Sequence, residues 1–473
     1  MITISLNPDS GQPMYIQIYE YIKAEILTGR LSPPEKLPSS RSLASYLQVS
    51  RSTVDTAYGQ LVAEGYIEAK EKRGYFVNPI THTQKFPISE RKTGMDYHKK
   101  KQSPSIFYDF NPDAIDTTHF PYSVWKSIGK NQLDNPDNFL MGDSFGDPEL
   151  RQVISDYLHG SRGVNCTPEN IVVGAGLDHL LQMLCVLFER RPVIAMEDPG
   201  YLRARQVLCA GGYRVLDIPL KDNAFDVDRL EKTEADICYV TPTHQFPLGS
   251  IMPISRRQKL LLWASERENR YIIEDDHDSE FRYKGKPIPA LQSLDSREKV
   301  IYIGTFSKAI SPAIRMGYMV LPPLLMERYR RYLSGYACPV SRMGQAIMTD
   351  FIRDGYFEKH LNRMRKIYKG KHDKMIEYLT EMFPCGTLDI TGDHAGLYIL
   401  LHYHGPLSEE ELDERAKKNG IRLRSLREYY ANVPAGYHPT YLLGFANLDE
   451  KQMKEGITCL ARKVFLSHRP YPS

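Results

Sequence analysis

A lysine that follows an apolar run is the side chain in this sequence best suited to covalent chemistry. Lys308 ends the run 304–308 (Gly-Thr-Phe-Ser-Lys), and the apolar residues just before this run are typical of a buried strand. A lysine amine can form a Schiff base with a carbonyl cofactor. Groups that could bind a phosphate of such a cofactor lie nearby in the sequence, at Thr305, Ser307 and Arg315. Taken alone, the run is explained more simply as a surface lysine after a strand.

Three other stretches carry residues that such a cofactor would need. A Gly-Ala-Gly run at 174–176 follows an apolar run and opens a helix, whose bare amides suit a phosphate. The acidic run 274–278 follows another apolar run, and a carboxylate there can pair with a protonated pyridine nitrogen. Tyr201 could stack on a ring. Each has a plainer explanation: a weak glycine motif, a solvated acidic turn and an ordinary helix start.

The elements that must position these residues are predicted by an alternation of apolar runs and helical stretches through residues 107–473. Strand-like runs lie at 171–173, 192–196, 237–240, 271–273 and 300–303. This alternation predicts an α/β domain with a mostly parallel sheet between helices. Ligands of such sheets bind at the carboxyl ends of the strands, where the candidate residues fall.

Residues 1–78 predict a different kind of domain. Helical periodicity marks a helix over about 13–28 and another that ends at Gly65, with a short helix at 40–47 between them and a hairpin after them. This is the layout of a winged helix-turn-helix, in which the third helix enters a major groove by its N-terminal end. Candidate DNA-contacting residues are Arg51, Ser52 and Thr53 on that helix and Lys72 and Arg73 at the hairpin tip.

The charge of residues 1–78 leaves a helical protein-interaction module open as an alternative, because eight Lys/Arg balance eight Asp/Glu. The runs 37–44, 49–54, 61–67 and 74–77 resemble the DNA-binding domain of GntR-type bacterial regulators. This resemblance covers nearly the whole segment and implies double-stranded operator DNA as a partner. It implies residues at or near DNA at Ser39, Arg41, Arg51, Ser52, Thr53 and Gly74.

The order of candidate residues in the larger domain resembles fold-type I pyridoxal phosphate enzymes, and the runs 241–247, 273–281 and 304–308 resemble the aminotransferase class I/II family. The fusion to the first segment resembles the MocR/GabR family of regulators. The resemblance implies pyridoxal 5'-phosphate bonded to Lys308, a pyridine partner at Asp275, and a homodimer in which the DNA-binding arm of one subunit packs on the other. It implies phosphate contacts from Ala175, Gly176, Ser307 and Arg315.

Several positions depart from the aminotransferase pattern. Phe246 stands where an asparagine usually contacts the cofactor phenolate, His277 stands where the regulators usually have tyrosine, and Leu177 replaces a hydroxyl residue of the phosphate loop. The last strand lacks the usual carboxylate-binding arginine, so the candidates for binding an effector carboxylate are Arg203, Arg424 and Arg427. Arg203 aligns best, whereas a solvated edge explains the other two equally well. These departures favour capture of an amine over its turnover.

The rest of the composition bounds the function classes. Residues 79–106 have a net charge of +4 and are predicted to form a flexible basic linker, which could also follow DNA phosphates. Seven scattered cysteines argue for reduced thiols and against a disulfide frame or a metal site. No apolar run approaches the length of a membrane helix and no signal peptide precedes the first domain, so we expect a cytoplasmic protein.

The leading hypothesis is a pyridoxal-phosphate-dependent transcriptional regulator that senses an amino acid or other primary amine by aldimine exchange at Lys308. RNA polymerase is a further candidate partner. Two alternatives stay open: a working aminotransferase with an accessory DNA-binding domain, and a sensor of the cofactor itself. Neither the effector nor the operator follows from the sequence.

Overall fold

The computed structural model describes residues 4, 6–7, 11–79, 106–283, 285, 287–392 and 394–466. The chain divides into two compact units, Met1–Lys101 and Gln102–Ser473, and each is described by itself. The predicted linker at 79–106 lies outside the described residues except for its two end positions.

The N-terminal unit is a winged helix-turn-helix, as the periodicity predicts. Its elements are α1 (Met14–Leu27), α2 (Ser40–Leu47), α3 (Arg51–Ala63), β1 (Ile67–Lys70) and β2 (Gly74–Val77). The hydroxyls of Ser39 and Ser50 accept hydrogen bonds from the amides of Ser42 and Thr53, each at 3.2 Å, and so begin α2 and α3. Apolar side chains of all three helices form one core, including Ile22, Leu43 and Tyr58.

The larger unit is built on a mixed sheet with the strand order β4-β11-β10-β9-β8-β5-β6-β7 among the described residues. The four strands β10, β9, β8 and β5 pair in parallel, and β6 continues this arrangement. The strands are β4 (Ile171–Gly174), β5 (Ile194–Asp198), β6 (Val215–Lys221), β7 (Ala224–Phe225), β8 (Ile237–Val240), β9 (Tyr271–Asp276), β10 (Val300–Thr305) and β11 (Gly317–Val320). The mostly parallel α/β architecture is therefore confirmed.

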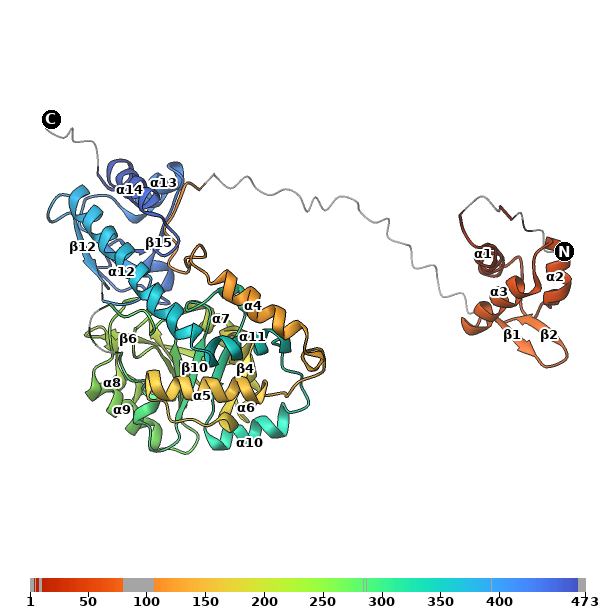
Figure 1. The fold of residues 1–473 in the computed structure, drawn as a ribbon, viewed down its shortest axis with the longest axis horizontal. Coiled ribbons are helices and arrows are strands. Elements are labelled where there is room, and N and C mark those ends of the chain that lie inside the picture. The colour runs from red at the N-terminus through yellow and green to blue at the C-terminus, as the bar shows by residue number, and fades with distance from the viewer. Residues whose placement is uncertain are drawn as a thin grey trace. The chain divides into compact units, whose positions relative to one another are not determined.

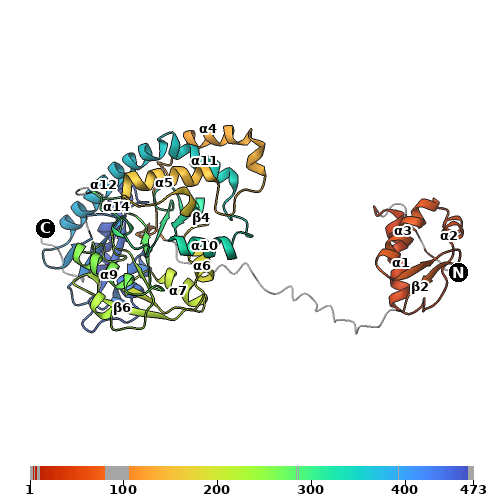
Figure 2. The same ribbon diagram turned by 90° about the horizontal axis from the view of Figure 1, so that it is seen from below.

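Helices cover both faces of this sheet, because successive strand residues point to opposite sides. Val172 packs with α6, α7 and α10, whereas its neighbours Ile171 and Val173 pack with α5, α11 and α12. Figures 1 and 2 show the two helical layers on opposite sides of the sheet. The helices are α4 (Tyr122–Leu133), α5 (Pro148–Arg162), α6 (Leu177–Leu187), α7 (Leu202–Ala210), α8 (Val227–Leu230), α9 (Ile254–Ser265), α10 (Pro323–Tyr332), α11 (Arg342–Arg353) and α12 (Tyr356–Met382).

A smaller antiparallel sheet follows α12, with the strand order β12-β13-β16-β15. Its strands are β12 (Leu388–Thr391), β13 (Tyr398–Tyr403), β15 (Arg424–Ser425) and β16 (Thr440–Gly444), and its helices are α13 (Glu409–Lys418) and α14 (Glu450–Cys459), which continues into the π-helical turn η7 (Leu460–Phe465). The first described residues of the larger unit reach this region, where β3 (Tyr108–Asp109) pairs in parallel with β14 (Ile421–Arg422).

The acidic run after residue 273 is not a solvated turn. Strand β9 extends to Asp276, and Glu274, Asp275 and Asp276 are all buried. Two backbone amides, those of Leu291 and Gln292, donate to the Glu274 carboxylate at 2.7 and 2.8 Å, which explains how one of these acids is accommodated in the interior. No described helix is both long and apolar enough to cross a membrane.

Candidate functional site

The strand register brings the predicted site residues to one edge of the sheet. Ile303 and Gly304 of β10 lie opposite Asp275 and Asp276 of β9. On the other side of β10, Thr305 pairs with Gly317 of β11, which pairs in turn with Gly174 of β4. The loops after β4, β9 and β10 therefore open next to one another, although the first is separated from the other two by more than 100 residues of sequence.

A cavity of about 450 Å³ lies at this edge. Its walls include most of the predicted cofactor residues: Tyr201, Asp275, His277, Thr305, Ser307, Lys308 and Arg315. Side chains of the smaller sheet region, such as Arg424 and Tyr429, also line it. The candidate site thus lies between the two sheets of the larger unit.

Lys308 lies in the loop after β10, and its side chain is 20% exposed. Its Nζ donates to the backbone oxygen of Pro112 at 3.0 Å and lies 3.3 Å from Asp113 Oδ1. The alternative of an ordinary surface lysine does not describe this position, since the amine is held inside a cavity wall.

Asp275 offers a carboxylate oxygen without a partner. Its side chain is buried, and the hydroxyl of Tyr239 on β8 donates to Oδ2, while Oδ1 has no hydrogen-bond partner among the described residues. Burial raises the pKa of Asp275 to about 6, although His277 and the bond from Tyr239 act in the opposite direction. A protonated ring nitrogen in the cavity would supply the missing donor, so this residue fits the pyridine of pyridoxal phosphate.

The loop after β4 forms a cradle at the start of α6. Gly176 has a φ of +86°, and a Cβ added there would lie 3.1 Å from Nη2 of Arg315. The same nitrogen of Arg315 donates to the backbone oxygen of Ala175 at 2.9 Å. The first amides of a helix lack partners within the helix and attract anions, and here an arginine faces them. This cradle fits the cofactor phosphate.

We expect Gly176→Ala to weaken cofactor loading about tenfold. The substitution forces alanine into a left-handed backbone and moves Arg315 away from the helix start. Titration of cofactor-free protein with pyridoxal phosphate would measure the effect. Gly160→Ala is the matched control, because an added Cβ there meets nothing within 4 Å. Equal loading of both variants would contradict the predicted cradle.

Aromatic side chains form one wall of the cavity. The ring of Phe246 meets those of Tyr201 and His277 edge to face, with centroids 5.3 and 5.7 Å apart. Phe246 has no hydrogen-bonding group, so the contact that asparagine supplies in the family pattern is absent at this position. Phe246 and His277, which both depart from the family pattern, therefore lie together in the cavity wall.

Two histidines share one buried carboxylate behind this wall. Nδ1 of His244 lies 2.8 Å from Asp278 Oδ1, and Nε2 of His277 lies 3.2 Å from the same oxygen. Burial opposes ionisation of Asp278, but the two histidines outweigh it and hold its pKa below the usual range. Ligand atoms of the three residues lie within 4.8 Å of one another, as in a metal site, although no metal is expected from the sequence. The hydrogen bond between Nδ1 of His244 and Asp278 fixes the orientation of the His244 ring, whereas Nε2 of His277 has no hydrogen-bond partner among the described residues.

The three candidate effector arginines lie in different surroundings. Arg203 and Arg424 line the cavity, where each has an acidic neighbour: Asp178 at 3.2 Å and Glu428 at 3.1 Å. Arg427 is not among the cavity-lining residues described and lies 3.9 Å from Glu409. The geometry thus brings two of the three candidates to the cofactor residues.

The predicted DNA-contacting residues lie at helix starts and at the hairpin. Arg51 is 62% exposed at the start of α3, with Nε 3.4 Å from Asp55. The hydroxyls of Ser52 and Thr53 lie 2.8 and 2.7 Å from that of Ser50, and the hydroxyl of Ser39 caps α2. Exposed positions include Arg41, Lys72 and Arg73, and Gly74 has a φ of +102°. Ser39 is therefore a helix cap as well as a predicted DNA contact.

Several residues that line the cavity or contact its walls were not predicted from the sequence. For Tyr239 the sequence offers one signal, a hydroxyl group in an otherwise apolar strand. Asp113 and Tyr429 come from distant parts of the chain and carry no motif. Asp178 lies in the first turn of α6, 3.7 Å from Arg315, where a carboxylate competes with a bound phosphate.

Comparison with known proteins assigns both units. Residues 113–460 match the family described as aminotransferase class I and II, and residues 14–77 match the bacterial regulatory proteins of the gntR family. The chain is 40% identical to the uncharacterized HTH-type transcriptional regulator YdeL of Bacillus subtilis, covering 96% of this chain and 98% of YdeL. It is 33% identical to the probable rhizopine catabolism regulatory protein MocR of Rhizobium meliloti, covering 98% and 96%.

Among solved structures, the kynurenine aminotransferase of Pyrococcus horikoshii matches with a TM-score of 0.66 and 28% identity. The match covers 77% of this chain and 91% of that enzyme, whose crystals hold PMP. The cavity geometry, both family matches and the full-length regulator relatives agree with one another. The chain therefore belongs to the aminotransferase class I and II family and, through its N-terminal gntR-family domain, to the MocR-type regulators.

Proposed function

We propose that this protein is a pyridoxal-phosphate-dependent transcriptional regulator that senses an amino acid or another primary amine at Lys308. The observation that carries the proposal is a cavity that holds Lys308, the unpaired oxygen of Asp275 and the Arg315 cradle, in one chain with a gntR-family domain. When bound, pyridoxal phosphate supplies an aldehyde for which Lys308 and an incoming amine compete.

The residues of the chain divide the task of holding the cofactor. Lys308 would hold the aldehyde carbon, Asp275 the ring nitrogen, and Arg315 with the start of α6 the phosphate. Tyr201 offers a ring face in the cavity wall. Arg203 and Arg424 are the cations available for an effector carboxylate, which would have to replace their present acidic neighbours.

Sensing is favoured over turnover by two residues of the cavity wall, Phe246 and His277. Phe246 cannot donate a hydrogen bond to the cofactor oxygen, and His277 stands where the regulators usually have tyrosine. Transamination needs ordered proton transfers, whereas capture needs only affinity. A ligand that fits one domain arrangement better than another shifts the population between them.

The test is a spectral screen of amino acids and amines against the cofactor-loaded protein, followed by a DNA-binding assay with each amine that changes the spectrum. A regulator is expected to change its DNA affinity or footprint with such an amine. A change caused by the cofactor alone, with no amine, would instead support a sensor of the cofactor.

A working aminotransferase is the second candidate, supported by Lys308, Asp275 and Arg315 in one cavity and by the likeness to an aminotransferase structure. Mixing the loaded protein with amino acids and 2-oxo acids separates the two functions. Steady turnover on the order of 1 per second or faster would rule out a regulator that only senses.

The DNA-binding part of the proposal predicts a specific loss for Arg51→Ala. The side chain is exposed at the start of α3, the position from which a recognition helix reads bases. We expect operator binding to weaken by about 1–3 kcal/mol, with a smaller effect on unrelated DNA. Fluorescence anisotropy with both DNAs would measure it. Arg30→Ala is the control, because Arg30 is also exposed, at 70%, but follows α1. An unchanged operator affinity for Arg51→Ala would mean that another residue reads the bases.

We also propose that the protein works as a homodimer. Large apolar side chains are exposed together after α4: Phe139 at 68%, Leu140 at 63% and Met141 at 84%. Such a group on a protein surface marks a contact site, and a second copy is the simplest partner. Light scattering of the purified protein would distinguish a dimer from a monomer. Exchange of DNA-binding arms between subunits, contact with RNA polymerase and a cytoplasmic location belong to the same proposal.

A further inference from the structure

The larger unit begins with a segment that runs from the end of the predicted linker to the cofactor lysine. We name residues 106–113 the lead-in segment. Its backbone is fixed to the smaller sheet region: the amide of Phe107 donates to Gly420 at 2.8 Å, and that of Phe110 to Arg422 at 3.2 Å. Its far end supplies both acceptors of Lys308, the Pro112 oxygen and Asp113. The segment thus joins the linker to the reacting amine within eight residues.

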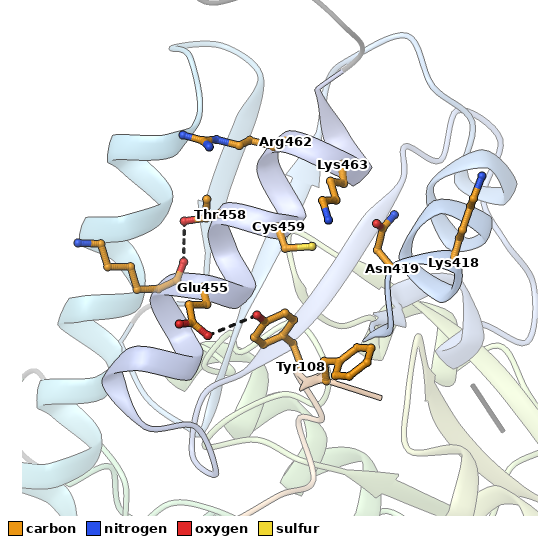
Figure 3. Close-up of a pocket in the computed structure, with 10 residues that line it drawn as sticks. Tyr108, Lys418, Asn419, Glu455, Thr458, Cys459, Arg462 and Lys463 are labelled. Carbon is orange, nitrogen blue, oxygen red and sulfur yellow. Dashed lines mark hydrogen bonds between the residues drawn. The ribbon is translucent and has the colours of Figure 1, made fainter. Parts of the chain in front are cut away.

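The first part of this segment also borders a second hollow, of about 720 Å³ (Figure 3). Figure 3 shows Tyr108 beside α14, with its hydroxyl directed at Glu455, 3.4 Å away. This hollow contains none of the predicted cofactor residues, and its cations are surface side chains. A Cβ added at Gly456 of α14 would lie 3.2 Å from Tyr108 and 3.0 Å from Phe110, so these two rings of the segment pack on α14.

Tight packing ties the end of the lead-in segment nearest Lys308 to the smaller sheet. Phe110 is fully buried in the core, and its oxygen accepts from the amide of Gly444 at 3.0 Å. A Cβ at Gly444 would lie 2.2 Å from the oxygen of Asn111, so the segment passes directly over β16. A change in the contact at Asp113 therefore acts on the whole segment and on the smaller sheet.

The contact at Asp113 depends on the chemical state of Lys308. A free lysine ammonium has three N–H donors and can serve both Pro112 and Asp113. A lysine nitrogen that is double-bonded to the former aldehyde carbon of the cofactor has at most one hydrogen. The double bond fixes the direction of that N–H group. If the effector arrives as an ammonium ion and its nitrogen replaces that of Lys308 on this carbon, Lys308 is released as an ammonium ion. The protons balance, so the exchange needs no other reactant.

We propose that the Pro112 oxygen and Asp113 receive the Lys308 ammonium when an effector amine replaces it, and that the lead-in segment carries this change toward the linker. Asp113 is then a positioning residue, and the segment is a latch that closes when the lysine is free. The proposal rests on the function proposed above, in which an amine and Lys308 compete for one cofactor.

Hydrogen exchange of the amides in residues 106–116 of the full-length protein tests the latch. Cofactor-free protein should exchange slowly there, and cofactor-loaded protein at least about threefold faster, because Lys308 is then engaged. Methylamine added to the loaded protein should restore slow exchange. The spectrum of each sample reports separately whether the cofactor is loaded and whether methylamine displaces the lysine.

Variants separate the latch from the proposed function. In cofactor-free protein, Lys308→Ala should raise exchange of the segment to the loaded level, and Asp113→Asn should raise it partway. Asp109→Asn is the matched control, because Asp109 lies on the same segment but pairs with Arg422 at 2.9 Å. It should alter the baseline while leaving the difference between cofactor-free and loaded protein intact.

Unchanged exchange in cofactor-free Lys308→Ala and Asp113→Asn overturns the latch, whatever the spectra show. A methylamine titration that leaves the spectrum of the loaded protein unchanged overturns amine sensing instead, and the cofactor-free variants still decide the latch.

Discussion

Lys308→Ala is expected to abolish the response to amines while leaving DNA binding intact. The substitution removes the only described amine in the cavity wall, so the cofactor can no longer be held by a covalent bond. The visible-edge absorbance of the lysine-bonded cofactor should disappear, and effector amines should no longer change the DNA footprint. DNA affinity without effector should stay unchanged, because the DNA-binding residues belong to a separate compact unit.

Absorbance spectra and footprinting of the same preparation would measure both effects. Lys299→Ala is a suitable control, since Lys299 lies just before β10 and donates to the backbone oxygens of Arg267 and Glu268, at 3.2 and 2.8 Å. A Lys308→Ala protein that still changed its footprint with the effector would show that sensing does not pass through the lysine.

Asp275→Asn is expected to weaken cofactor binding by about tenfold to a hundredfold. The carboxylate lies buried with Oδ1 free for a ring nitrogen, and a hydrogen bond to a charged group contributes about 1.5–3 kcal/mol. Asparagine has the same shape but cannot carry the charge. Since burial raises the pKa of Asp275 to about 6, the measurement belongs at a pH near 8, where the carboxyl group is ionised.

Titration of cofactor-free protein with pyridoxal phosphate would give the affinity, and the absorbance maximum would report the ring electronics. Tyr239→Phe is the matched variant: it removes the hydroxyl that holds Oδ2 but leaves Oδ1 available, so a smaller loss is expected. Loss of affinity in Tyr239→Phe but not in Asp275→Asn would mean that the ring nitrogen has a different partner.

The N-terminal unit was predictable almost residue by residue. Its helices are short, separate and amphipathic, and local signals such as the serine caps at Ser39 and Ser50 mark where they begin. The alternation that predicts the main sheet is also local, because each buried strand must be apolar on both faces. What the pattern could not show is that β11 runs antiparallel between β4 and β10, since pairing direction depends on distant segments.

The acidic run 274–278 shows the limit of a local interpretation. A cluster of acids suggests a solvated turn, yet β9 carries Glu274, Asp275 and Asp276 into the interior. Partners from elsewhere in the chain make this possible: backbone amides of the segment at 291–292, Tyr239 and Arg162, whose Nε lies 2.8 Å from Asp276. Burial of an acid is a property of its tertiary neighbours, which no local pattern encodes.

By itself the sequence determined the types of residue available for chemistry and their order along the chain: a glycine loop, an aromatic ring, an aspartate, a lysine and an arginine, behind a DNA-binding domain. Only the tertiary structure decided which of them meet. It placed Arg203 and Arg424 in the cavity wall but not Arg427, left Oδ1 of Asp275 unpaired, and brought Asp113 to Lys308 across 195 positions of sequence. Such contacts depend on how sheets and loops pack in space, and spacing along the chain carries no record of that packing.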